Sequence, residues 1–352
     1  MTDPRAALAD RLFDGLLGAM ELQTVHLGLQ LGLYAALRAA PLTAAELAKA
    51  AGADERYARE WLEQQATAGL LGVDDAAAAP DARRYALDAG TAEVLLDEAS
   101  PFYFGTPAGL AHGLASTLDG VQEAFRSGGG VPYADFGPHI RHGIAGFNRP
   151  MFAHQLATEW FPAVPGLVEK LTGAAVLDLG CGLGHSSVAM ALAYPSVTVR
   201  GVDLDEASVA GARRTAAAAG VADRVSFTRG DAAEVTGSYD VVTIFEALHD
   251  MSDPVGTLRA ARAALAPGGM VVVADDKALE RFTPGAEPVE RLILAFSVLH
   301  CLPATRAENG PTAHGTALRP DTLRAWAAAA GFTEADVLDV PNDFFRFYRL
   351  AH

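Results

Sequence analysis

Three glycines at alternate positions, preceded by an acid, form the first stretch of the chain whose pattern points to chemistry. The sequence VLDLGCGLGHSS spans residues 176–187 and places Asp178 two residues before Gly180, with Gly182 and Gly184 following. A β-branched and leucine run that ends in such glycines predicts a strand, a tight turn and a helix. A pyrophosphate-binding turn carries its third glycine one residue later, where this chain has His185. The pattern therefore argues against a dinucleotide ligand.

Acidic residues follow the next two strand-like runs. VTVRGVDLD places Asp203 at the end of the second run, with Leu204 after it, and RVSFTRGDAAE places Asp231 and Ala232 after the next run. The carboxyl ends of parallel strands meet at one edge of a sheet, where ligands bind. At that edge Asp203 is placed to accept both hydroxyls of a ribose, and Asp231 is placed to accept the amino group of an adenine.

A histidine and an acid follow the fourth strand-like run, in IFEALHDMSDP (residues 244–254). His249 is a candidate general base, because an imidazole near its ordinary pKa can take a hydroxyl proton, an effect of roughly 10²–10⁴ in rate. Asp250 is a possible orienting partner. Asp275, which ends the fifth run in VVVADDKA, is a second acid that can orient His249 or contact a substrate.

The elements that must position these residues alternate between strands and alanine-rich helices from residue 174 onward. The strand-like runs are 175–179, 197–202, 225–228, 239–245 and 270–274. This alternation predicts an α/β fold with a Rossmann-like doubly wound parallel sheet. ADVLDV and FFRFYRL, separated by a short turn, predict that the sheet finishes in a C-terminal antiparallel hairpin.

The first part of the chain predicts an all-helical and winged-helix domain. A helical segment over residues 8–39 has a broad apolar face, which predicts a homodimer. Thr43 and Glu46 form a capping-box pattern that opens a short helix, and residues 54–68 form the next helix. LLGV and RYAL then read as the two strands of a wing. We expect a dimerisation domain over 1–95, a helical linker and pocket lid over 96–165, and the α/β domain over 166–352.

The amino-acid composition limits which kinds of molecule the protein is expected to bind. The chain has 43 acids against 27 Lys and Arg, a formal charge of −16, which disfavours nucleic acid because phosphates repel an acidic surface. The helix that would enter a DNA groove is itself net acidic. No membrane-length apolar span and no signal peptide are recognisable, and two cysteines make no disulfide framework. We therefore expect a cytoplasmic protein that binds neither nucleic acid nor membranes.

The order of the motifs over residues 174–352 resembles the class I S-adenosylmethionine-dependent methyltransferases. With the winged helix and FNRPM (residues 147–151), the chain is similar to small-molecule O-methyltransferases that dimerise through their N-terminal domains, and to bacterial winged-helix methyltransferases of unknown acceptor. The resemblance implies that His249 removes the acceptor's proton and that Phe147 and Met151 wall the acceptor pocket. It implies S-adenosyl-L-methionine as cofactor, held by Asp178, Gly180, Gly182, Gly184, Asp203, Leu204, Asp231, Ala232 and Phe245.

Two alternatives to hydroxyl methylation of a small-molecule acceptor remain open. His300 lies in a loop-rich insertion, and with His249 and Asp250 it could bind iron or zinc, as in similar C-methyltransferases that act on 2-oxo acids. No sequence-close ligand spacing supports this, so no metal is assigned and His300 is placed in the substrate pocket. A non-catalytic regulator that senses the cofactor would need a basic recognition helix. Met251 replaces the tryptophan of aromatic-acceptor relatives, which puts a planar aromatic acceptor in doubt.

Overall fold

The structure, a computed structural model, describes residues 3–308, 310 and 312–351. The chain divides into two compact units, one made of Met1–Ala115 and Pro138–Pro150 and the other of Ser116–Gly137 and Met151–His352. Each unit has a hydrophobic core. The division into 1–95, 96–165 and 166–352 stays a prediction.

The first unit is helical, with a small two-stranded wing. Helix α1 begins after Asp3, whose carboxylate accepts the backbone N–H of Arg5, and the predicted capping box of Thr43 and Glu46 is present at α3. The wing pairs β1 with β2 in antiparallel fashion. Three helices followed by this wing confirm the predicted winged helix. The elements are α1 (Pro4–Gln30), α2 (Leu33–Leu37), α3 (Ala44–Ala51), α4 (Glu55–Thr67), β1 (Gly72–Val73), β2 (Tyr85–Ala86), α5 (Ala89–Leu96), η1 (Thr106–Gly109) and α6 (Leu110–Ser116).

Two aromatic side chains and one amide tie α1, α2 and α4 together in this unit. Tyr34 and Trp61 pack edge to face with ring centroids 4.9 Å apart. Their polar atoms are satisfied, because the Trp61 Nε1–H donates to the Thr24 carbonyl at 3.0 Å and the Tyr34 hydroxyl bonds Gln65. A buried polar atom with a partner avoids the desolvation cost of an unpaired one. The packing therefore fixes how α1 joins the winged helix.

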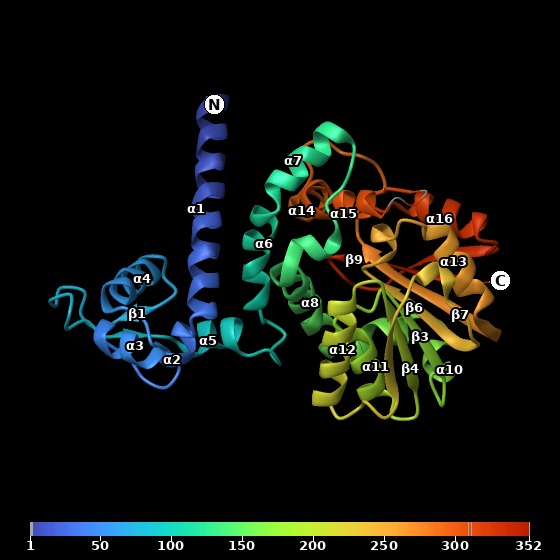
Figure 1. Cartoon of the computed structure of the whole chain (residues 1–352), viewed down its shortest axis with the longest axis horizontal. Coiled ribbons are helices and arrows are strands. Elements are labelled where there is room, and N and C mark those ends of the chain that lie inside the picture. Colours follow the sequence, from blue (N-terminus) through green and yellow to red (C-terminus); the bar gives the residue numbers. More distant parts are fainter. Residues whose placement is uncertain (1–2, 309, 311, 352) are drawn as a thin grey trace. The chain divides into compact units, whose positions relative to one another are not determined.

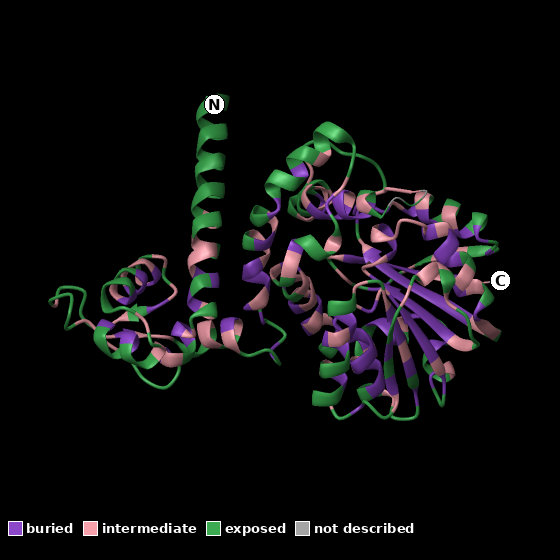
Figure 2. Cartoon of the chain, viewed as in Figure 1, coloured by how far each residue is buried: buried purple, intermediate pink, exposed green. Residues whose placement is uncertain are grey.

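Most of α1 is exposed in the part of the chain that the structure describes. Only Val25, His26 and Gly28 of this helix are buried, and its first half is exposed on all sides (Figure 2). The exposed large apolar residues of α1 are Leu8, Leu12, Phe13, Leu16, Leu17, Met20, Leu22 and Leu27. Exposed apolar surface of this extent marks an interaction site. The broad apolar face expected from the sequence is therefore present and open to solvent.

The second unit contains a seven-stranded sheet in the order β5-β4-β3-β6-β7-β9-β8. Strands β3 to β7 pair in parallel, and β9 and β8 close one edge in antiparallel fashion (Figure 1). This confirms the doubly wound sheet with a C-terminal hairpin. The strands are β3 (Ala175–Leu179), β4 (Thr198–Asp203), β5 (Val225–Arg229), β6 (Tyr239–Phe245), β7 (Leu265–Asp276), β8 (Glu334–Leu338) and β9 (Phe345–Ala351).

Helices cover both faces of the sheet because neighbouring apolar residues of each strand point in opposite directions. In β3, Val176 joins the core on one face and Leu177 joins the core on the other. The first core includes residues of α11 and α12, and the second includes residues of α13 and α16, which lie on opposite sides of the strands in Figure 1. The covering helices are α11 (His185–Ala193), α12 (Glu206–Ala218), α13 (Pro254–Ala263) and α16 (Pro320–Ala329).

Short helical pieces complete the chain, and two of them are π-helical turns, η3 and η6. Such turns are rare and occur frequently at functional sites; η6 carries His300 and Cys301. Among the described residues, no helix combines the length and the apolar content that crossing a membrane requires. The remaining pieces are α7 (Leu118–Ser127), η2 (Tyr133–Phe136), α8 (Gly137–His154), η3 (Leu156–Trp160), α9 (Phe161–Ala163), α10 (Leu167–Lys170), η4 (Ala232–Glu234), η5 (Leu248–Asp250), α14 (Pro288–Phe296), η6 (Ser297–Cys301) and α15 (Leu302–Ala307).

Candidate active site

The glycine turn lies between β3 and α11, as predicted. Gly180, Gly182 and Gly184 all have positive φ angles, of 70°, 50° and 79°, which residues other than glycine rarely adopt. A Cβ on Gly180 would lie 2.4 Å from the Cβ of Ala247, whereas a Cβ on Gly182 would meet nothing within 4 Å. Gly180 therefore lets the turn pack against the loop after β6, and open space remains beside Gly182.

Replacing Gly180 by alanine is expected to destabilise the turn more than replacing Gly182. Both substitutions place a side chain at positive φ, at a cost of about 1–2 kcal/mol, and Gly180→Ala adds the collision with Ala247. Denaturant unfolding of the two variants measures the difference. Equal losses of unfolding free energy would show that the close approach to Ala247 does not matter.

Asp178 lies beneath this turn and is fully enclosed. Its carboxylate accepts hydrogen bonds from the hydroxyls of Ser186 and Ser187, both at 2.6 Å, and from Thr243 at 2.8 Å. Burial raises the pKa of Asp178, and the three hydroxyls oppose that rise. The carboxylate thus links β3, β6 and the first turn of α11. Direct contact of Asp178 with a cofactor stays a prediction.

The two acids at the strand ends lie on neighbouring strands. Asp203 ends β4, and its oxygens accept the backbone N–H groups of Gly182 at 2.8 Å and Asp205 at 2.9 Å. Asp231 follows β5, and the N–H of Gly230 donates to the Asp203 carbonyl at 3.0 Å. The structure therefore brings Asp203, Asp231 and the glycine turn to one edge of the sheet.

This edge holds the residues expected to bind the nucleoside part of the cofactor. Asp203 accepts the two backbone N–H groups, and its contact with the ribose hydroxyls stays a prediction. Asp231 is exposed, and one of its oxygens accepts the Ala233 N–H. Leu204, between them in sequence, is 48 % exposed, whereas Phe245 is buried in an aromatic cluster with Phe152 and Trp160.

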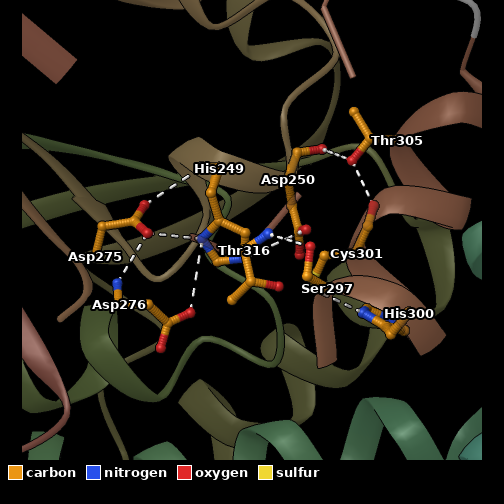
Figure 3. Close-up of polar contacts among 9 residues, drawn as sticks. All are labelled: His249, Asp250, Asp275, Asp276, Ser297, His300, Cys301, Thr305 and Thr316. Atoms are coloured by element: carbon orange, nitrogen blue, oxygen red, sulfur yellow. Dashed lines mark hydrogen bonds and ion pairs between the residues drawn. The ribbon is translucent and has the colours of Figure 1, made fainter. Parts of the chain in front are cut away.

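His249 lies in the short helix η5 after β6 and is enclosed by carboxylates (Figure 3). Its Nδ1 is 2.7 Å from Asp275 Oδ1, and its backbone N–H donates to Asp275 Oδ2 at 3.3 Å. Its Nε2 is 3.3 Å from Asp250 Oδ1, and Asp276 Oδ2 is 3.9 Å from Nδ1. The His249 side chain is only 2 % exposed. The structure therefore brings His249, Asp250 and Asp275 together, and their catalytic roles stay a prediction.

The acids change the protonation of His249. Burial alone would lower the pKa of His249, but Asp275 and Asp250 outweigh burial and hold that pKa well above its usual range. The pKa of His249 therefore differs from the ordinary value expected from the sequence, because both carboxylates contact its enclosed ring. Burial and neighbouring acids also raise the pKa of Asp276 to about 7.

Glu246, Asp276 and Cys301 belong to this cluster and were missed from the sequence. Glu246 has a φ of 48°, a conformation that non-glycine residues seldom adopt and that clusters at functional sites. Burial and Asp276 raise its pKa far above the usual range. The doubled acid in VVVADDKA was a usable signal for Asp276, but nothing in the sequence distinguishes Cys301 from an ordinary buried thiol.

His300 adjoins the cluster through Cys301. The His300 Nδ1 lies 3.5 Å from the Cys301 Sγ, and its ring packs against Phe136 with centroids 4.6 Å apart. The His300 Nε2 is buried without a hydrogen-bond partner. Asp250 Oδ1 is also buried, and its contact is the ion pair with His249. Burial lowers the pKa of His300. His314, from the same insertion, instead places Nε2 3.3 Å from the Ala317 carbonyl.

Around His249, two groups of described side chains already have ligand atoms close enough to share a metal ion. Ligand atoms of His249, Asp250 and Cys301 lie within 4.8 Å of one another, and so do those of His249, Asp275 and Asp276. Phe147 and Met151, predicted to wall the acceptor pocket, are both half-buried in α8. Met151 packs against the core of the second unit. A pocket-lining role for these two residues stays a prediction.

Comparison with known proteins agrees with this arrangement. Residues 170–300 match a family described as a methyltransferase domain, and residues 18–96 match the Rv2258c-like winged HTH domain. The chain is 35 % identical to a ubiquinone biosynthesis O-methyltransferase of Pseudomonas aeruginosa over 188 residues, which cover 52 % of this chain and 75 % of the relative. It is 29 % identical to a mitomycin biosynthesis 6-O-methyltransferase of Streptomyces lavendulae, over 84 % of this chain and 85 % of the relative.

Solved structures show the same fold over the full length. The mitomycin 7-O-methyltransferase MmcR aligns with a TM-score of 0.73 at 23 % identity, covering 99 % of this chain and 98 % of that one. Human N-acetylserotonin methyltransferase, solved with S-adenosylmethionine, aligns with a TM-score of 0.71 at 16 % identity, covering 99 % and 98 %. The chain therefore belongs to the S-adenosylmethionine-dependent methyltransferases and combines their α/β domain with an Rv2258c-like winged-helix domain.

Proposed function

We propose that this enzyme methylates a hydroxyl oxygen of a small-molecule acceptor, with His249 as the general base. The observation that carries the proposal is the contact between the glycine turn and the loop that bears His249. The position of a Gly180 Cβ is 2.4 Å from Ala247 and 3.5 Å from Met251 Cε, so residues on both sides of His249 lie against the cofactor turn. The imidazole is thus held beside the site where the methyl donor is expected.

S-adenosylmethionine, when bound, supplies a methyl group on an electrophilic sulfonium. Asp203 is proposed to hold the ribose hydroxyls, and Asp231 the adenine amino group, with Leu204, Ala232 and Phe245 around the purine. The glycine turn leaves room for the amino-acid part beside Gly182. Holding donor and acceptor in line is a large source of acceleration in such reactions.

In its neutral form, His249 can receive the acceptor's proton at Nε2. The Nδ1–H donates to Asp275 at 2.7 Å, which fixes the ring and stabilises the imidazolium that forms. Asp250, whose side chain is 32 % exposed, occupies Nε2 in this structure and must turn away for a hydroxyl to approach. Its departure removes one of the two carboxylates that raise the pKa of His249. The hydroxyl proton then passes to Nε2 as the C–O bond forms and the C–S bond breaks.

A product analysis tests the proposal. The full-length enzyme is incubated with S-adenosylmethionine labelled in the methyl group and with a panel of hydroxylated small molecules, and S-adenosylhomocysteine formation is followed. The names of the relatives, which include O-methyltransferases of ubiquinone and mitomycin biosynthesis, guide the choice of the panel. A labelled methyl ether supports the proposal. A product labelled on carbon or nitrogen would refute it.

A metal-assisted C-methyltransferase is the second candidate, and specific atoms favour it. His300 Nε2 is buried without a hydrogen-bond partner, and His249, Asp250 and Cys301 can share an ion. Imidazole, carboxylate and thiolate together suit zinc or iron. With these ligands, an ion would hold the acceptor's oxygen and acidify the adjacent carbon.

Chelation distinguishes the two candidates. If His249 acts as a free base, dialysis against a chelator is expected to change turnover less than twofold, because no step of the hydroxyl route needs an ion. Turnover is measured before dialysis, after it, and after addition of Zn²⁺ or Fe²⁺. A loss above tenfold that one of these ions restores would replace the first candidate by the second.

We also propose a homodimer formed through α1, because its exposed apolar residues have no cover in the chain. Leu12 and Leu16 lie one helical turn apart and are 63 % and 58 % exposed. Replacing both by glutamate is expected to halve the mass that light scattering gives for the wild type. Phe282→Glu, at a 72 % exposed site in the second unit, is the control. A wild-type monomer would contradict the proposal. The cytoplasmic location inferred from the sequence likewise stays a prediction.

A further inference from the structure

Three histidine rings pack together in the first unit, whereas the cluster around His249 belongs to the second unit. His26 comes from α1, His112 from α6 and His139 from α8. The ring centroids are 5.4 Å apart for His26 and His112, 4.9 Å for His26 and His139, and 4.7 Å for His112 and His139. Three imidazoles from three helices therefore pack against one another.

The nitrogens of these rings are not committed to other protein groups. In the part of the chain that the structure describes, none of the three rings joins a hydrogen bond or an ion pair, and their contacts are with one another. His26 is 9 % exposed, His139 is half-buried and His112 is exposed. Burial and the two neighbouring imidazoles lower the pKa of His26, which favours the neutral ring that metals bind.

Gly109 makes the close packing possible. A Cβ at this position would lie 3.1 Å from Nδ1 and Cε1 of His26 and 4.0 Å from His139 Nδ1. That spacing is tighter than an ordinary van der Waals contact, so a side chain there would push against the His26 ring. The glycine keeps the His26 side of the cluster clear.

We propose that His26, His112 and His139 form a binding site for a divalent transition-metal ion of the zinc type. A metal–nitrogen bond of about 2.0–2.1 Å places each ring centre about 3.2 Å from the ion. At a tetrahedral angle, ring centres would then be about 5 Å apart, as the three centroids are here. The exposed side of His112 leaves the fourth position to water.

Ring rotation completes the site. The rings now lie stacked or edge to face, and rotation about the Cβ–Cγ bond, a broad torsion, turns one nitrogen of each ring toward the centre. The bound ion would join α1 to α6 and α8 and stabilise the first unit according to its concentration and affinity. This role is independent of methyl transfer.

Titration of the full-length protein with Co²⁺ tests the site, because Co²⁺ takes zinc positions and absorbs visible light there. The wild type is expected to bind with an intense tetrahedral spectrum, and Zn²⁺ is expected to displace the Co²⁺ and raise the melting temperature. His112→Ala, a change at an exposed side chain, should weaken Co²⁺ binding at least tenfold. His139→Gln should do the same.

The control is His154→Ala, which removes another exposed histidine of α8 and should leave Co²⁺ affinity unchanged. If a second Co²⁺ ion binds near His249, its binding should remain in the His112→Ala variant, which distinguishes it from the ion held by the three histidines. Equal affinity and equal stoichiometry in the wild type, His112→Ala and His139→Gln would overturn the proposal, as would a wild type without the tetrahedral spectrum.

Discussion

Replacing His249 by alanine is expected to lower turnover by about 10²–10⁴, the usual contribution of a positioned general base. The affinity for the cofactor should stay within a few-fold, because no contact from His249 to Asp203, Asp231 or the glycine turn holds that edge together. Steady-state rates and a binding titration with S-adenosylhomocysteine measure the two effects separately.

The control for this variant is His154→Ala, which removes an exposed histidine of the same unit and should leave both quantities unchanged. A parallel loss of turnover and cofactor affinity in His249→Ala would indicate a structural histidine. Retained turnover would eliminate the proposed base altogether.

The acids around His249 predict how turnover depends on pH. Burial lowers the pKa of His249, but Asp275 and Asp250 raise it further, to well above the usual range. A base works only when neutral, so turnover should rise with pH through the raised pKa of His249 and level off above it. Asp275→Asn removes one raising charge and should move this rise to lower pH while reducing the plateau. If turnover of the Asp275→Asn variant rose at the same pH as that of the wild type, Asp275 would not act through His249.

The sheet and its ligand edge were predictable because they depend on local patterns. Apolar runs such as 175–179 and 239–245 match β3 and β6 residue for residue. In parallel strands the residues that follow each run meet at one edge, so Asp203, Asp231 and His249 could be placed there without knowledge of the packing. The same reasoning placed Asp275 at the end of the fifth strand.

The surroundings of His249 were not predictable, because they depend on which segments pack against its loop. Cys301 reaches the cluster from a π-helical turn, a feature without a sequence signature. The location of Asp250 against Nε2 instead of the solvent depends on the packing around Thr305, whose hydroxyl donates to the Asp250 carbonyl at 3.3 Å. The raised pKa of His249 comes first from Asp275 and then from Asp250, and the close approach of both carboxylates to the ring could not be read from the motif.

The histidine trio illustrates the same limit at longer range. His26, His112 and His139 are separated by 86 and 27 residues in the sequence and show none of the short spacings by which metal sites are recognised. Their approach depends on how α1, α6 and α8 pack around Gly109. Only tertiary structure brings such residues together.

Replacing Asp203 by alanine is expected to weaken the binding of S-adenosylhomocysteine by about 10²-fold or more. Two hydrogen bonds to a charged group contribute about 1.5–3 kcal/mol each, and about 1.4 kcal/mol corresponds to tenfold in affinity. The substitution also removes the carboxylate that accepts the N–H groups of Gly182 and Asp205. The glycine turn then loses this anchor, in addition to the loss of the proposed contact with the ribose. Calorimetric titration of the wild type and the variant measures the loss.

Asp231→Ala is the matched control, because Asp231 is an acid at the neighbouring strand end that anchors only its own short helix, through Ala233. It should weaken binding by about tenfold, the value of one hydrogen bond to a charged group. Asp203→Asn should fall between the two, since its amide keeps one accepting oxygen. If the Asp203→Ala variant bound S-adenosylhomocysteine as tightly as the Asp231→Ala variant, the anchoring of the glycine turn by Asp203 would make no contribution to binding. If neither variant lost affinity, the nucleoside would have to lie elsewhere on the sheet.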